Sequence, residues 1–557
     1  MPSVRGRDSG IWNDVRIEDC SDVVLGDPLV TSRVAGPDTL ASMTVSVKAA
    51  NLSDVEVSGT LSGHVADIEF SRKVILAPGE NEFAFSPDEF PQLKDRRIAL
   101  WWPNGYGNPV LHEAAFNFIP EGGESAAASV NWQAGIREFT YSDVMSDLKM
   151  FINGHRFFPK GGNWGFSEYN LRFGADEYDT AVRMHRDMNL NMIRNWVGQT
   201  GDEEFYEACD RYGIVVWQDF WLANPADGPD PDDNAMFLDN ARDYLSLIRR
   251  HPSIGLYCGR NEGYPPAELN SGLASAVSGL HPGIVYIPSS ADDGVSGHGP
   301  YRAVEPDTYF TMPVSKFHTE RGMPAIMEYE SLRQMLTDGH LWPSDDVWGQ
   351  HDFTRTGAQG DTAFVGMVRR RFGDVALESA ESFAKYAQWI NYDGYRAMYE
   401  ANNVLRKGLL IWMSHSAWPS LAWQTYDYWF RPTAACAAVR KACEPVHVQL
   451  NPATGTVEVV NAGICPLDGL TATVDVLSPD GSGIWSASAT VDAPEDSTVP
   501  AVEMNGVPDG LCIVRLKLTG KDGGVVSENR YFKNFRNGSD TGDYRGLVGT
   551  RWLESFE

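Results

Sequence analysis

Two glutamates each follow a short apolar run, a position from which a carboxylate can do acid–base or nucleophilic chemistry. Glu262 comes after the run at 254–258 and the residues Gly259, Arg260 and Asn261, and Glu320 ends the run at 317–320. Cleavage of a glycosidic bond requires one protonated carboxyl to serve the leaving oxygen and one ionised carboxyl to attack the anomeric carbon. Spacing alone leaves open the plainer alternative, in which each glutamate only forms a salt bridge with a loop arginine.

For these carboxylates to meet, the segment 147–442 must bring strand ends together. Apolar runs alternate there with stretches of helical periodicity, which predicts parallel β-α-β units. We expect helices at 176–188, 203–212, 236–249 and 382–406, and strands at 157–160, 192–197, 214–220, 254–258, 284–287, 317–320 and 409–413, with an eighth strand within 298–312. This rhythm predicts a (β/α)8 TIM barrel, whose active site lies at the carboxyl ends of its strands. A doubly wound sheet is the alternative.

Other side chains at the predicted strand ends could bind a substrate. The polar candidates are Asn261, Arg194 and Asp219, and the aromatic candidates are Trp164, Trp196, Trp418 and Trp423. Tryptophan rings stack on the C–H faces of sugars and keep water out of a site, although a core this rich in tryptophan also buries some for packing alone. Arg194 could orient Glu320 and keep the pKa of that carboxyl low through its opposite charge; a purely structural ion pair is the alternative.

The rest of the chain is predicted to form β-domains. Short runs of alternating apolar and polar residues predict β-sandwiches at 18–120 and 443–535, with a linker at 121–146 and a polar, aromatic tail at 536–557. Residues 10–17 look like the last strand of a preceding domain, so for 1–17 we expect only a remnant strand of that domain. We therefore expect the chain to be a fragment of a longer protein.

Composition and charge exclude several classes of function. The chain has 557 residues and a net charge of −29, so its surface should repel nucleic acid. It has neither an 18-residue apolar run nor a signal-like N-terminus, which argues against a membrane partner. The seven cysteines include no CxxC pair, and His318, His340, His351 and His415 match no ligand spacing, so we expect no catalytic metal and no cofactor. The same composition favours the cytoplasm, with the periplasm or secretion as alternatives, and leaves a homo-oligomer open.

Several motifs, in order and spacing, resemble glycoside hydrolase family 2. They are WWPNGYG at 101–107, GIR at 135–137, FING at 151–154, KGGNW at 160–164, GRNE at 259–262, LLIWM at 409–413 and WPSLAWQTYD at 418–427. Within that family the chain is most similar to β-mannosidases, exo-β-glucosaminidases and plant-type endo-β-mannosidases. The N-terminal jelly-roll sugar-binding domain of the family is apparently missing, and residues 414–419 depart from the stretch that many β-mannosidases carry there.

The resemblance implies a retaining, exo-acting β-glycosidase with immunoglobulin-like sandwiches around its barrel and a carbohydrate as its partner. It implies Glu262 as acid/base, Glu320 as nucleophile and Asn261 as a contact of the sugar 2-substituent. Glu328 is the rival nucleophile, because the residues before it resemble the nucleophile strand of β-galactosidases. Two further alternatives are a catalytically impaired carbohydrate-binding fragment and a β-galactosidase or β-glucuronidase of the same family. An unrelated barrel hydrolase that uses Asp219 with a histidine fits the motifs poorly.

Overall fold

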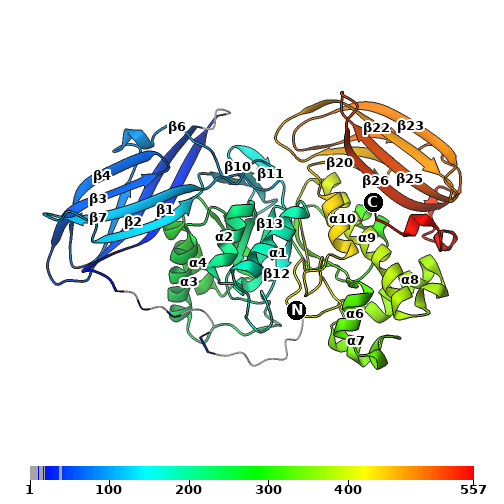
Figure 1. The fold of residues 1–557 in the computed structure, drawn as a ribbon, viewed down its shortest axis with the longest axis horizontal. Helices are drawn as coiled ribbons and strands as arrows, with labels where there is room; N and C mark the ends of the chain where they lie inside the picture. Colours follow the sequence, from blue (N-terminus) through cyan, green and yellow to red (C-terminus); the bar gives the residue numbers. More distant parts are fainter. Residues whose placement is uncertain are drawn as a thin grey trace.

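The computed structural model describes residues 19–36, 40–312 and 314–556, together with residues 10, 11, 15 and 17. A first antiparallel sandwich, a central region of parallel strands and helices, and a second antiparallel sandwich follow one another along the long axis of the molecule (Figure 1). The remnant strand expected at 10–17 lies largely outside the described residues.

The centre is an eight-stranded parallel sheet with the strand order β16-β15-β14-β13-β12-β19-β18-β17. Consecutive strands are neighbours and the first, β12, also pairs with the last, β19, so the sheet curls round until β16 and β17 form its two free edges. This arrangement confirms the predicted parallel β-α-β units and is consistent with a TIM barrel. The strands are β12 (Lys160–Trp164), β13 (Met192–Asn195), β14 (Val215–Asp219), β15 (Ile254–Arg260), β16 (Val285–Ser289), β17 (Val295–Ser296), β18 (Phe317–Arg321) and β19 (Leu409–Ile411).

Two strands of this sheet lie outside the ranges predicted for them. The first is 160–164 rather than 157–160, because Gly161 belongs to the strand: a Cβ there would stand 2.0 Å from the carbonyl oxygen of Met192 on the neighbouring strand. The eighth strand is the two-residue β17, just before the expected interval 298–312, and that interval instead contains helix α5 (Pro306–Thr311). Two residues are too few to produce a periodic signal in the sequence.

Helices follow most of the parallel strands. They are α1 (Ala175–Asp187), α2 (Glu203–Tyr212), α3 (Asn234–Ile248), α4 (Ala267–Leu280), α6 (Tyr329–Met335), α7 (Asp346–Gln350), α8 (Val365–Phe372), α9 (Ala380–Leu405) and α10 (Ala434–Ala442). The long helix α9 begins at Ser379, whose side chain accepts a hydrogen bond from the backbone N–H of Ser382, and ends where Arg406 adopts a left-handed conformation. None of the described helices is both long and apolar enough to cross a lipid bilayer.

The first sandwich consists of two antiparallel sheets around one apolar core. One sheet contains β1 (Val23–Ala35), β2 (Leu40–Asn51), β5 (Gly79–Phe85) and β6 (Arg96–Arg97), and the other contains β3 (Val57–Val65), β4 (Ile68–Leu76), β7 (His112–Pro120) and β8 (Ala128–Ala134). The segment 121–146, predicted to be a linker, instead supplies β8 and then β9 (Phe139–Ser142). Strand β9 forms a small sheet with β10 (Lys149–Ile152) and β11 (His155–Phe157).

The second sandwich packs against the helices of the centre (Figure 1). Its sheets contain β20 (Val446–Asn451), β21 (Thr456–Asn461) and β24 (Ser497–Glu503), and β22 (Leu467–Leu477), β23 (Gly483–Ala493), β25 (Gly510–Thr519), β26 (Val525–Arg536) and β27 (Ser539–Asp540). The predicted tail at 536–557 is not a loose end: Tyr544, Leu547, Trp552 and Leu553 are buried in the same core as α9.

Candidate active site

Glu262 and Glu320 both lie at the carboxyl ends of parallel strands. Glu320 belongs to β18 and is 3% exposed, whereas Glu262 stands two residues beyond β15 with 15% of its side chain exposed. The backbone of Glu262 has a φ of +43°, which is uncommon for a residue other than glycine, and its N–H donates to Ser290 Oγ at 3.0 Å. The left-handed turn directs the Glu262 carboxyl toward the same place as that of Glu320.

The hydroxyl of Tyr301 joins the two carboxyl groups. It lies 2.7 Å from Glu320 Oε2 and 3.1 Å from Glu262 Oε1, so these two oxygens are at most about 6 Å apart. A hydroxyl has one proton and can donate it to only one of the two. The arrangement therefore suits a pair in which ionised Glu320 accepts from Tyr301 while protonated Glu262 donates to it.

Arg194, at the end of β13, holds the buried side of the site together. Its side chain is fully buried, and its Nη1 donates to Glu320 Oε1 at 2.8 Å, while its Nη2 donates to Asp219 Oδ2 at 2.7 Å and to Asn261 Oδ1 at 2.8 Å. Asp219 is also fully buried and accepts from the indole N–H of Trp217 at 2.7 Å. The carboxylate of Asp219 is thus used to orient Arg194, which in turn orients Glu320.

The electrostatic balance at Glu320 differs from the expectation. Burial raises the pKa of Glu320 from its ordinary 4.5 to about 7, whereas the charge of Arg194 and the hydrogen bond from Tyr301 act to lower it. The prediction that Arg194 keeps this pKa low is right in the sign of its contribution and wrong in the net result. The reason is that the carboxyl is almost fully removed from water and shares the guanidinium with Asp219.

Asn261 is 3% exposed and lies within this network. Its Oδ1 accepts from Arg194 at 2.8 Å and from Ser290 Oγ at 3.2 Å. Because the oxygen is engaged, the NH₂ group is the part of Asn261 that can donate to a ligand. The predicted contact with a sugar 2-substituent stays a prediction.

Aromatic side chains form a wall beside Tyr301. Trp196, Trp412 and Trp423 belong to one small buried cluster, in which the ring centroids of Trp196 and Trp412 are 5.1 Å apart and those of Tyr301 and Trp412 are 6.3 Å apart. The indole N–H of Trp423 donates to the carbonyl oxygen of Tyr301 at 2.8 Å. The structure therefore brings two of the predicted tryptophans, Trp196 and Trp423, to the site.

The other two predicted tryptophans lie elsewhere. Trp164 is fully buried, stacked on His415 with ring centroids 4.1 Å apart, and belongs to the core rather than to the wall of the site. Trp418 is partly buried and donates its indole N–H to Asp352 Oδ2 at 3.2 Å, outside the cluster around Tyr301. Trp164 directly ends β12, but its side chain points to the helix side of the sheet, a choice that the sequence does not reveal.

Glu328, the rival nucleophile, is exposed and precedes helix α6, where it occupies the N-cap position. Residues 325–327 before it are buried, but they do not form the strand. The strand is β18, which lies where the sequence predicted it and ends at Arg321. Glu328 therefore has neither the arginine nor the tyrosine contact that Glu320 has.

The sequence interpretation missed four residues of the site. Tyr301 and Trp412 were not singled out, nor were His298 and Asn224, which contact Glu262 Oε1 at 3.0 Å and Oε2 at 3.2 Å. A signal existed for two of them, because Tyr301 and His298 flank Gly299-Pro300, a turn dipeptide inside the interval where a strand end was expected. Trp412 lay within the LLIWM motif itself.

The histidines and cysteines do not assemble into a metal site in the described parts of the chain. No group of three or more potential metal-binding side chains occurs there. His318, two residues before Glu320 in β18, instead contacts Ser296 Oγ at 3.0 Å and the carbonyl oxygen of Gly299 at 2.9 Å. It thereby fastens the loop that carries Tyr301.

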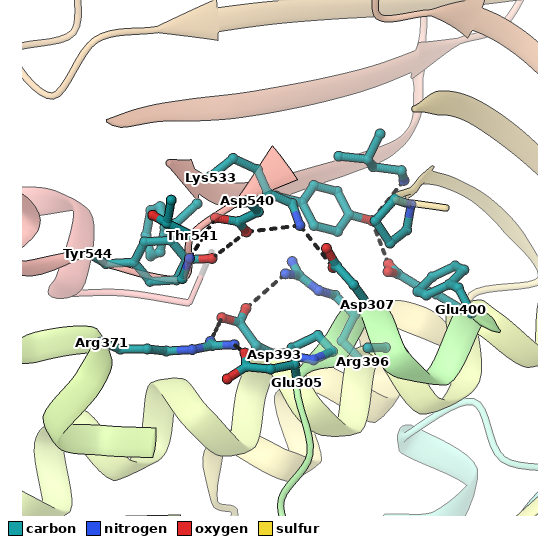
Figure 2. Close-up of a pocket in the computed structure, with 18 of the residues that line it drawn as sticks. Glu305, Asp307, Arg371, Asp393, Arg396, Glu400, Lys533, Asp540, Thr541 and Tyr544 are labelled. Carbon is teal, nitrogen blue, oxygen red and sulfur yellow. Dashed lines mark hydrogen bonds and ion pairs between the residues drawn. The ribbon is translucent and has the colours of Figure 1, made fainter. Parts of the chain in front are cut away.

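A separate cavity of about 500 Å³ lies between helices α5, α8 and α9 and strands β26 and β27 (Figure 2). Its charged groups are paired with one another: Arg371 and Arg396 donate to Asp393 at 2.8 and 2.9 Å, and Lys533 reaches Asp307 at 3.0 Å. Neither glutamate of the site lines it. Its ion pairs connect the central helices to the second sandwich, and it takes no part in the chemistry of Glu262 and Glu320.

Comparison with curated proteins identifies relatives of three kinds. The chain is 30% identical to a mannosylglycoprotein endo-beta-mannosidase of Lilium longiflorum, over 86% of this chain and 57% of that protein. It is 28% identical to an exo-beta-D-glucosaminidase of Streptomyces avermitilis, over 95% and 62%, and 26% identical to beta-mannosidase B of Aspergillus terreus, over 79% and 56%. The chain thus spans about three fifths of the length of these relatives. No protein-family model matches it.

Solved structures share the fold. The exo-chitosanase of Amycolatopsis orientalis superposes with a TM-score of 0.82 at 21% identity, over 95% of this chain and 68% of that one. The beta-D-mannosidase of Dictyoglomus thermophilum superposes with a TM-score of 0.82 at 22% identity, over 94% and 68%. These structures show a shared fold, and the curated relatives agree with the resemblance carried by the motifs: the chain is similar to the β-mannosidases and exo-β-glucosaminidases of glycoside hydrolase family 2.

Proposed function

We propose that the chain is a retaining, exo-acting β-glycosidase that removes terminal β-linked sugars, β-mannosides or β-glucosaminides, from oligosaccharides or glycoconjugates. In this proposal the curled parallel sheet is a (β/α)8 barrel and the two β-domains are immunoglobulin-like. The observation that carries it is the position of one hydroxyl, that of Tyr301, within 3.1 Å of both glutamate carboxyls. Retention needs carboxyls about 5–5.5 Å apart, and inversion needs a wider gap that admits a water.

The surroundings of the two glutamates suggest how the roles divide. Glu320 is 3% exposed and receives a charged hydrogen bond from Arg194, so it is held in one orientation, as a nucleophile must be. The side chain of Glu262 is 15% exposed and lies nearer to solvent, where a leaving group would depart. Glu262 is therefore the acid/base and Glu320 the nucleophile.

The reaction then proceeds in two balanced steps. In the first, the Glu320 carboxylate attacks the anomeric carbon and forms a glycosyl ester, while the bond from that carbon to the glycosidic oxygen breaks and the Glu262 carboxyl gives this oxygen its proton, so that the aglycone leaves as an alcohol. In the second, Glu262 takes a proton from water, whose oxygen attacks the same carbon and releases Glu320 as a carboxylate. Arg194 and Tyr301 stabilise that carboxylate in the free enzyme, because both donate hydrogen bonds to it.

The choice of sugar rests on the relatives and on the wall of the site. The relatives are named for β-mannosides and β-D-glucosamine, two sugars that differ from glucose at carbon 2. Asn261 has an NH₂ group to offer such a substituent, and the rings of Trp196, Trp412 and Trp423 supply flat apolar faces for a sugar ring. These features support a carbohydrate substrate without choosing between the two.

A mechanism-based label tests the nucleophile. A 2-deoxy-2-fluoro glycoside with a good leaving group should form a slowly hydrolysed ester, because fluorine destabilises the transition states on both sides of the intermediate. Digestion and mass spectrometry are expected to find the sugar on the peptide that contains Glu320. A label on Glu328, or turnover with no label at all, would refute the assignment.

An aryl glycoside panel tests the activity and the sugar. Nitrophenyl β-mannoside, β-glucosaminide, β-galactoside, β-glucuronide and β-glucoside should separate the candidates, and proton NMR of the first product should show the β-anomer. The Glu320→Gln variant serves as the inactive control. If no glycoside is turned over while sugars still bind, the chain is a carbohydrate-binding fragment and the proposed activity is wrong.

A further inference from the structure

His298 contacts the proposed acid/base although it lies in a loop that no motif covers. Its Nδ1 is 3.0 Å from Glu262 Oε1, the same oxygen that the Tyr301 hydroxyl approaches. Glu262 Oε2 accepts from Asn224 Nδ2 at 3.2 Å. Both oxygens of the Glu262 carboxyl therefore have side-chain partners. Among these partners within the described residues, His298 is the only imidazole.

The loop that carries His298 is fastened to the strand of the nucleophile. Strand β17 pairs with β18 just before the loop, and the N–H of Gly299 donates to the carbonyl oxygen of Glu320 at 3.2 Å just after it. His298 itself has a φ of +69°, a left-handed conformation that is unfavourable for a residue with a Cβ. A loop anchored on both sides and strained at its centre holds the imidazole in place.

His298 and Tyr301 approach the same oxygen from different sides. Tyr301 lies between the two carboxyls and is packed against the tryptophan cluster. The side chain of His298 is 60% exposed, so it lies on the outer side, toward solvent. In an exo-acting site the sugar to be cleaved occupies the inner end, and the leaving group extends outward past this imidazole.

We propose that His298 is a positioning residue that holds the Glu262 carboxyl for proton transfer to the leaving group. The inference rests on the proposed function and assigns to it a residue that acts through the acid/base. Neutral His298 with its proton on Nδ1 donates to Glu262 Oε1 in both steps, so it orients the carboxyl while the carboxyl's own proton stays available to the leaving group, and the imidazole neither gains nor loses a proton.

The test compares His298→Ala with wild type on aryl β-mannosides, or on β-glucosaminides if the panel selects that sugar, with leaving groups from dinitrophenol to phenol. We expect kcat/KM to fall about tenfold for the phenyl glycoside and less than about twofold for the dinitrophenyl glycoside, because only the poorer leaving group depends on the acid. His298→Asn, which keeps a donor and an acceptor, should recover most of the loss. An equal loss on all substrates, or none, would overturn the proposal.

A matched control and a second readout separate this proposal from the proposed function. His340 is also an exposed histidine hydrogen-bonded to a carboxylate, that of Asp345, but it lies away from Glu262. His340→Ala should therefore leave kcat/KM unchanged for both the phenyl and the dinitrophenyl glycoside. The ¹⁵N chemical shift of His298 Nδ1 should change in Glu262→Gln, because that atom loses the carboxylate oxygen 3.0 Å away. An unchanged chemical shift would refute the contact whether or not the chain is active. A changed chemical shift in a chain that turns over no glycoside would refute the proposed function, and the role in catalysis with it.

Discussion

Replacing Tyr301 with phenylalanine removes one oxygen atom from between the two carboxyls and leaves the packed ring in place. The hydroxyl donates to Glu320 Oε2 at 2.7 Å and so stabilises the ionised form of that carboxyl. A hydrogen bond to a charged group contributes about 1.5–3 kcal/mol, and one pKa unit corresponds to about 1.4 kcal/mol. The pKa of Glu320, already raised to about 7 by burial, should therefore rise by roughly 1–2 further units.

The pH dependence of kcat/KM measures this shift. Activity rises as the nucleophile ionises, so the acidic limb of the wild-type profile should fall near the pKa of Glu320, about 7, and the limb of Tyr301→Phe should move to higher pH by roughly 1–2 units. Below the shifted limb the loss in kcat/KM should reach about 10- to 100-fold and shrink as the pH rises.

Tyr264→Phe is the matched control, because the Tyr264 hydroxyl also donates to a carboxylate, that of Asp293 at 3.0 Å, and stands two residues from Glu262. It should leave the acidic limb unchanged. If the limb of Tyr301→Phe stays within about 0.3 units of wild type while folding is intact, Tyr301 does not stabilise the Glu320 carboxylate and the reasoning is refuted.

Three further predictions concern Glu320 and residues around the two glutamates. Asp219→Asn removes the anion that orients the buried Arg194, so kcat should fall at least tenfold with little change in KM, and the Tm should drop. The control Asp239→Asn breaks an exposed ion pair and should change neither kcat nor the Tm. An unaltered kcat in Asp219→Asn would show that Asp219 does not position Arg194. The raised pKa of Glu320 means that the folded state binds its proton more tightly than the unfolded state, so this group's contribution to stability is complete below about pH 4.5 and is lost as the pH rises through about 7. Between those pH values the free energy of unfolding of Glu320→Gln should therefore rise relative to that of wild type by up to about 3 kcal/mol. A Tm difference between the two proteins that does not grow with pH would contradict the burial argument. Trp164→Ala should lower stability by about 3–5 kcal/mol without altering the KM of the folded fraction, whereas Trp423→Ala should raise KM; the reverse pattern would place Trp164 in the wall of the site.

Regular elements with a strong periodicity were predictable from the sequence. Helix α2 was predicted at its observed residues, and the strands before Glu262 and Glu320 were found to within two residues, because buried strands read as continuous apolar runs. Strand β12 was shifted by three residues because Gly161 resembles a turn signal. Its lack of a side chain is in fact required by the close approach of Met192.

The sequence by itself predicted the resemblance to the family and the two candidate glutamates, because residue types and their order around strand ends are local properties of the chain. Only the tertiary structure decided which groups meet those glutamates. Tyr301 lies 39 residues after Glu262 and 19 before Glu320, and it reaches both because a loop with left-handed residues turns it inward. The net pKa of Glu320 was likewise decided in three dimensions, since the loss of water around a buried carboxyl outweighs the attraction of one arginine, and no pattern along the chain records how much water a fold removes.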